Sequence, residues 1–135
     1  MTILLDGYFV TAIDLFMDPV AVKFGSWKWI GGGSYFGVPI GNFIGWFIVT
    51  IMVVGIFRTY EYFFPKKEAT FNKSIFIIPV LGYGIMSISY FFLALNFNYT
   101  LAIIGSVFML PQVIFNLILF SKYKFNIKHQ ISYKD

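Results

Sequence analysis

The sequence predicts an all-α fold, an integral membrane bundle of about four transmembrane helices. Of its 135 residues, 59% are apolar and only 12% are charged, whereas soluble domains usually carry about 25% charged residues. Apolar stretches recur along the chain, and most are long enough for a bilayer, which takes about 20 residues. The length fits one membrane domain, residues 1–135. Its predicted spans are approximately 3–22, 38–57, 75–95 and 101–120, with a polar loop at 58–74 and a basic tail at 121–135.

The first predicted span, residues 3–22, is the least regular because it contains aspartates and a proline. Pro19 lacks a backbone donor and disfavours the helical conformation at the residue before it. We therefore expect a break or kink there, with Asp18 capping a short helix that starts at Pro19. No basic segment precedes the apolar run and Asp6 interrupts it, so the pattern is not that of a signal peptide.

A glycine-rich connection leads to the second predicted span. Three consecutive glycines, Gly31 to Gly33, predict a flexible or tightly turned loop. The second span is expected to open near Val38-Pro39. Gly37, Gly41 and Gly45 are four residues apart, which predicts one helical face where another backbone can approach closely.

Basic residues set the expected orientation of the four spans. Eight of them fall on one side of the predicted bundle and two on the other, and the positive-inside rule then places both termini in the cytoplasm of a multi-pass cell-membrane protein. Because they lie at the edges of apolar runs, they do not indicate nucleic-acid binding. The eight are Arg58, Lys66, Lys67, Lys73, Lys122, Lys124, Lys128 and Lys134, and the two are Lys23 and Lys28.

The composition excludes cysteine chemistry and argues against a metal site. The chain has no cysteine, which excludes disulfides, thiolate catalysis and cysteine-ligated metals. Its one histidine, His129, stands in the basic tail without a second ligand nearby in sequence. We therefore predict no metal site.

Asp14 and Asp18 are the candidate acids. Their four-residue spacing places them on one helical face. Two carboxyl groups in a low-dielectric site cannot both ionise comfortably, so one is expected to hold its proton, and a protonated acid in an apolar pocket can protonate an alkene. In the alternative interpretation, Asp18 only caps a helix and Asp14 only hydrogen-bonds a neighbouring span.

Aromatic residues and one amide accompany these acids. Trp27, Trp29, Tyr35 and Trp46 could line a pocket and stabilise a cation with their π faces, or could form an interfacial aromatic belt. Asn42 lies one turn before Trp46 and could orient a water or an acid, or could bridge two helices by a hydrogen bond.

An ordered set of these residues resembles the membrane-embedded carotenoid biosynthesis proteins. The string runs Asp18-Pro-Val-Ala, Gly25-x-Trp27-x-Trp29, Gly33-x-Tyr35-Phe-Gly-Val-Pro39 and Asn42-Phe-x-Gly-Trp46. It covers about a fifth of the chain. The family includes the carotenoid 1,2-hydratases, such as those acting on γ-carotene and on bisanhydrobacterioruberin.

The resemblance implies a hydro-lyase in a lipid bilayer that adds water to the terminal 1,2 double bond of an acyclic carotenoid, with no cofactor. Asp14 and Asp18 would be its acid candidates and Asn42 would place the water. Trp27, Trp29, Tyr35 and Trp46 would bind the substrate.

Two aspects of the function stay open at this stage. Family members generally carry further helices before the opening segment, which implies a short or N-terminally truncated member and a second membrane chain as an expected partner. Enzymatic activity itself is open, because a carotenoid end-group cyclase and a non-catalytic membrane subunit or carotenoid-binding scaffold are the alternative functions.

The orientation can be tested with reporter fusions. Fusions placed after Tyr123 and within residues 66–73 should both report a cytoplasmic location, because the excess of basic residues lies on that side. A signal from the opposite side of the membrane at either position would overturn the predicted orientation.

Overall fold

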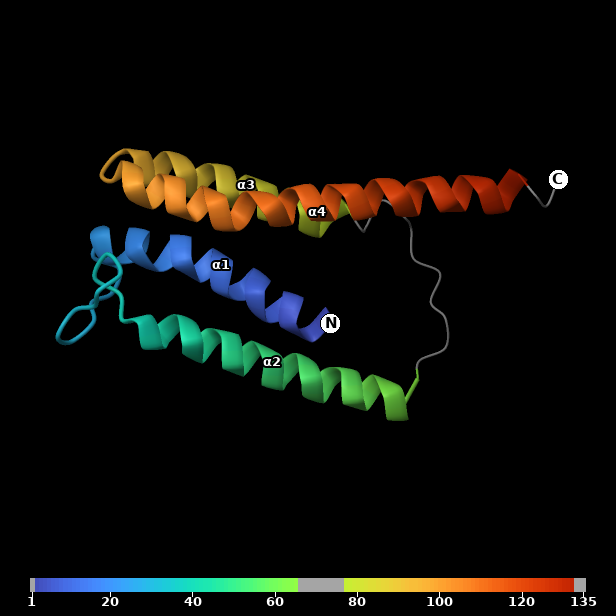
Figure 1. Cartoon of the computed structure of the whole chain (residues 1–135), viewed down its shortest axis with the longest axis horizontal. Helices are drawn as coiled ribbons and strands as arrows, with labels where there is room; N and C mark the ends of the chain where they lie inside the picture. Colours follow the sequence, from blue (N-terminus) through green and yellow to red (C-terminus); the bar gives the residue numbers. More distant parts are fainter. Residues whose placement is uncertain (1, 66–76, 133–135) are drawn as a thin grey trace.

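The computed structural model describes the backbone of residues 2–65 and 77–132 and the side chains of residues 3–65 and 77–122. The described chain forms four helices, α1 (Thr2–Lys23), α2 (Ile40–Phe63), α3 (Ile77–Leu95) and α4 (Tyr99–Ser132). Helix α1 lies between α2 and the α3–α4 pair and packs against all three (Figure 1). The predicted all-α membrane bundle is confirmed, and α1 is its central helix.

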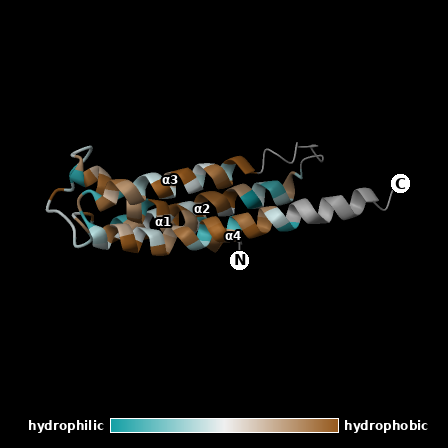
Figure 2. Ribbon diagram, turned by 90° about the horizontal axis from the view of Figure 1, so that it is seen from above, coloured by the Kyte–Doolittle hydropathy of each residue, from teal (hydrophilic) through white to brown (hydrophobic). Residues whose placement is uncertain are grey.

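Three of the helices are long and apolar enough to cross a membrane: α2, α3 and the Tyr99–Lys122 part of α4. Figure 2 shows hydrophobic residues along most of their length. Helix α1 is not in this set, since it carries Asp6, Asp14 and Asp18. Its 22 residues would extend about 33 Å at 1.5 Å per residue, close to the thickness of a hydrocarbon core. A fourth crossing by α1 stays a prediction.

Two helices run past the ends of their predicted spans. Helix α2 continues beyond Phe57 to Phe63, and α4 continues through the predicted tail to Ser132, because neither extension contains glycine or proline to stop it. The predicted lysines Lys66, Lys67, Lys73 and Lys134 lie outside the described residues, as do the side chains of Lys124, Lys128 and His129. The structure therefore does not test the predicted excess of basic residues on one side of the membrane.

Of the break or kink predicted at Pro19, the break is wrong, because α1 continues through Pro19, and Asp18 lies within the helix instead of capping one. A proline at position 19 leaves the Leu15 carbonyl without its intrahelical donor. The Tyr35 hydroxyl supplies that hydrogen bond instead, donating to the Leu15 oxygen at 3.0 Å. A side chain from the following connection thus lets the helix continue through its proline.

The connection between α1 and α2 is tightly turned at the glycines for which a turn was predicted: the Gly32 amide donates to the Trp29 carbonyl at 3.0 Å. A second tight turn follows at residues 35–38. The backbone groups of Tyr35 and Val38 exchange hydrogen bonds of 3.1 and 2.8 Å. Phe36 and Gly37 between them both have positive φ, at 48° and 88°, as in a type I′ turn. A side chain on Gly33 would overlap the Val38 backbone. This folding turns Tyr35 back onto α1.

The predicted close-packing face of Gly37, Gly41 and Gly45 is wrong for the described chain. Gly37 lies in the turn before α2, and a Cβ added to Gly41 or Gly45 would meet nothing within 4 Å. The close approach occurs at Gly105 of α4, where the Phe16 ring occupies the space of a Cβ. Sequence spacing identified a glycine stripe but could not show which glycines face another helix.

The bond between Tyr35 and Leu15 predicts a specific coupling in stability. Tyr35→Phe should lower the free energy of unfolding by about 1 kcal/mol, because it leaves a carbonyl without a donor. In a Pro19→Ala background the restored N–H can satisfy that carbonyl, so the same substitution should cost much less. Unfolding of the detergent-solubilised protein measures both values.

The matched control for this cycle is Tyr60→Phe, at an exposed tyrosine of α2, which should change stability little. An equal cost of Tyr35→Phe with and without Pro19 would show that the hydroxyl does not compensate for the proline.

Candidate functional site

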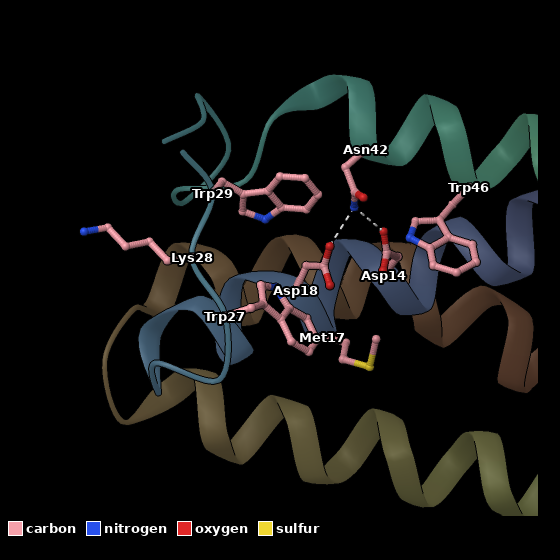
Figure 3. Close-up of a pocket in the computed structure, with 8 residues that line it drawn as sticks. All are labelled: Asp14, Met17, Asp18, Trp27, Lys28, Trp29, Asn42 and Trp46. Atoms are coloured by element: carbon pink, nitrogen blue, oxygen red, sulfur yellow. Dashed lines mark hydrogen bonds between the residues drawn. The ribbon is translucent and has the colours of Figure 1, made fainter. Parts of the chain in front are cut away.

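An open pocket of about 400 Å³ lies where α1, α2 and their connection meet. All the predicted site residues except Tyr35 line it, although they come from three separate segments (Figure 3). The lining residues are Asp14, Met17 and Asp18 of α1, Trp27, Lys28 and Trp29 of the connection, and Asn42 and Trp46 of α2.

The centre of the pocket is a pair of carboxyl groups bridged by one amide. Asp14 and Asp18 lie one turn apart on α1, and each residue is only 4% exposed. The Nδ2 atom of Asn42 donates to Oδ2 of Asp14 at 2.7 Å and to Oδ2 of Asp18 at 2.6 Å. An amide nitrogen carries two hydrogens, so a single side chain of α2 serves both acids. The hydrogen bond expected between Asp14 and a neighbouring helix is present, and it forms inside the pocket.

No cation neutralises this pair in the described part of the chain. The salt bridge found there joins Asp6 and Arg58 at 3.8 Å, away from the pocket. Lys28 lines the pocket, but its side chain extends away from the carboxyl groups (Figure 3). Like charges repel strongly where water is excluded, and a proton held by the pair relieves that repulsion. The arrangement is therefore suited to holding an acidic proton.

Indole rings flank the acids on two sides. Trp46 lies beside Asp14, while Trp27 and Trp29 lie on the side of Asp18 (Figure 3). Trp27 is 42% exposed and Trp46 46% exposed, so a contribution to an interfacial belt also fits these two rings. The rings supply apolar walls and π faces next to an acid, an arrangement that can stabilise a carbocation.

Tyr35 lies apart from the pocket lining. Its hydroxyl is engaged with the Leu15 carbonyl, and its ring packs edge-on against Phe43 with centroids 5.2 Å apart. Burial raises the pKa of Tyr35 to about 12, so the hydroxyl stays protonated, and able to donate, well into the alkaline range. The structure thus gives Tyr35 a supporting position between α1 and the start of α2.

Sequence reasoning missed Met17 and Lys28 as pocket residues. Met17 is three residues after Asp14 and next to Asp18, so helical spacing from the acids could have identified it. Lys28 lies in a connection without periodicity, and no comparable signal marks it. Among the side chains described, residues 3–65 and 77–122, no cluster of three or more histidines or acidic residues could hold a metal ion.

Comparison with known proteins adds one match. A family model described as carotenoid biosynthesis protein matches residues 1–112, a range that contains every residue of the pocket lining. Searches of curated proteins and of solved structures found no match.

The bridging amide predicts the effect of exchanging site residues. Asn42→Asp would place three carboxyl groups together without a bridging donor, and should destabilise the protein by about 1–3 kcal/mol. Adding Asp14→Asn returns one amide and two carboxyl groups to the site, and should recover most of that loss. Melting temperatures in detergent measure both effects.

The control for this exchange is Asn98→Asp. Asn98 caps α4 through Oδ1, which accepts a hydrogen bond from the Leu101 amide at 3.0 Å, and aspartate caps a helix about as well. A double variant no more stable than Asn42→Asp alone would show that the bridge contributes little.

Proposed function

The chain belongs to the carotenoid biosynthesis protein family, and we propose that it is a hydro-lyase acting on an acyclic carotenoid. In this proposal it adds water to the terminal 1,2 double bond of the carotenoid end group. One observation carries the proposal: two buried carboxyl groups share the Asn42 amide inside a pocket with three tryptophans.

The first step would be proton transfer to the double bond. The isolated trisubstituted alkene is a weak base, and a positioned general acid typically accelerates such a transfer by about 10²–10⁴-fold. A carboxyl group of the Asp14–Asp18 pair gives its proton to the less substituted carbon. The π electrons form the new C–H bond, which leaves a tertiary cation on the dimethyl-substituted carbon.

The second step would be capture of this cation by water. The oxygen forms the C–O bond, and one proton of the attacking water returns to the carboxylate pair. The sum is the addition of one water molecule without any change in the oxidation state of the enzyme. Asn42 keeps both carboxyl groups at fixed positions through the two steps.

The size and openness of the pocket agree with a substrate bound by its end. A volume of about 400 Å³ is at the lower end of the range typical of small-ligand sites, so a long polyene would extend beyond it. Apolar side chains of α2 such as Ile48 and Met52 are at least half exposed and suit contact with a polyene or with lipid. We propose that the lipid bilayer surrounds the remainder of the substrate.

The surroundings of the protein are part of the same proposal. We place the chain in the cell membrane with both termini cytoplasmic, as the basic residues predict. A second membrane chain stays a proposed partner.

The proposed reaction can be tested in a bacterium that makes lycopene. Expression of the chain should yield a carotenoid alcohol heavier than its precursor by one water, or by two where both ends react. Asp14→Asn and Asp18→Asn retain the side-chain size but cannot supply the proton, so the donor variant should lose at least about 99% of the activity. Pigment mass spectrometry after extraction measures the product.

Asp6→Asn is the matched control, because it makes the same change at the exposed Asp6–Arg58 pair, away from the pocket, and should retain activity. A well-expressed wild type that yields no new pigment would contradict the stand-alone hydratase. A new pigment of unchanged mass would indicate a cyclase. Full activity in both pocket variants would exclude the carboxyl pair as the acid.

A further inference from the structure

The indole nitrogen of Trp29 is a buried donor without an acceptor in the described part of the chain. A buried N–H group left without a hydrogen bond costs about 1–3 kcal/mol, and most buried tryptophans have a partner. The other two pocket tryptophans are more exposed, at 42% and 46%, and their nitrogens are not among the buried unpaired atoms. The Trp29 nitrogen therefore has no hydrogen-bond acceptor among the described residues, and an oxygen atom of a bound molecule would satisfy it.

The surroundings of this nitrogen indicate which oxygen fits. Trp29 lines the pocket beside Asp18 (Figure 3). Asn42 donates a hydrogen bond to Oδ2 of Asp18. The other carboxyl oxygen of Asp18 lies on the side away from the Asn42 amide (Figure 3). A water molecule needs two or more polar partners in a buried position. Trp29 offers a donor and Asp18 an acceptor at the same end of the pocket (Figure 3), and together they would supply the two partners of a water.

We propose that Trp29 positions the water that captures the carbocation, an inference that rests on the proposed hydration. The indole N–H donates to the oxygen of this water, and Asp18 accepts one of its hydrogens. When the oxygen forms the C–O bond to the tertiary carbon, that hydrogen passes to the Asp18 carboxylate as a proton. Asp14, beside Trp46 at the other end of the pair, has by then given the proton that forms the C–H bond, and transfer of a proton from Asp18 to Asp14 restores the starting state.

This assignment separates the two halves of the reaction. Proton transfer depends on the carboxyl pair, whereas capture depends on a water held in place. If the water is not held, the cation has no nucleophile in position and loses a proton to return an alkene. In D₂O the recovered substrate would then carry deuterium on carbon.

The test uses the full chain, purified in detergent and supplied with lycopene in D₂O. Two quantities are measured by mass spectrometry: hydrated product, and deuterium in the recovered lycopene. Trp29→Phe keeps an aromatic wall but removes the N–H donor. The ratio of hydration to exchange should fall by about tenfold or more, which is the effect of losing one hydrogen bond, while exchange continues.

Two further variants complete the design. Trp27→Phe removes an indole N–H from the same pocket, and should leave the ratio of hydration to exchange unchanged, whatever its effect on the rate. Trp29→His returns an N–H donor on a smaller ring and should recover part of the ratio, which provides a second measurement if Trp29→Phe does not fold.

The outcomes distinguish this inference from the function on which it rests. An unchanged ratio in Trp29→Phe, with hydration intact in the wild type, would overturn the role of Trp29 alone. A ratio that falls equally in Trp27→Phe would also overturn it. A wild type that neither hydrates nor exchanges would refute the proposed hydration itself.

Discussion

The structure depends on keeping one polar helix buried at the centre of an apolar bundle. Helix α1 packs against the three other helices, yet it carries two nearly inaccessible carboxyl groups and a proline that removes a backbone donor. Buried polar groups are costly unless they are hydrogen-bonded. The connection and the start of α2 supply the partners: Asn42 bonds both acids and Tyr35 bonds the carbonyl left by Pro19. These contacts attach α2 to α1, and α2 has no comparable packing against α3 or α4.

The same contacts build the candidate site. Asn42 and Trp46 are one turn apart on α2, so the amide that bonds the acids also brings an indole beside Asp14. The tight turn at Phe36-Gly37 returns the chain to α1, and the segment before it carries Trp27 and Trp29 to Asp18. Stability and the proposed chemistry therefore use the same side chains. A substitution at Asn42 is expected to affect both, whereas loss of the Trp29 N–H affects only what the pocket can hold.

Much of this arrangement could be predicted from the sequence because it depends on local patterns. Apolar length located the helices, and the four-residue spacing of Asp14 and Asp18 placed both acids on one face. The errors came from partners distant in sequence. Nothing near Pro19 shows that Tyr35 will satisfy the freed carbonyl, so a helix break was expected. Likewise the spacing of Gly41 and Gly45 does not show that their face is open, while Gly105, outside any stripe, receives the Phe16 ring. Tertiary contacts decided each of these cases, and a periodic pattern does not contain them.

The source of the oxygen atom in the product distinguishes hydration from an oxidation. In the proposed reaction the Asp14–Asp18 pair adds water to an alkene without an oxidant. The purified chain, supplied with lycopene under anaerobic conditions in ¹⁸O-labelled water, should therefore form a carotenoid alcohol that carries the label on its hydroxyl oxygen. An alcohol that requires molecular oxygen, or one whose oxygen is unlabelled, would contradict hydration by the carboxyl pair.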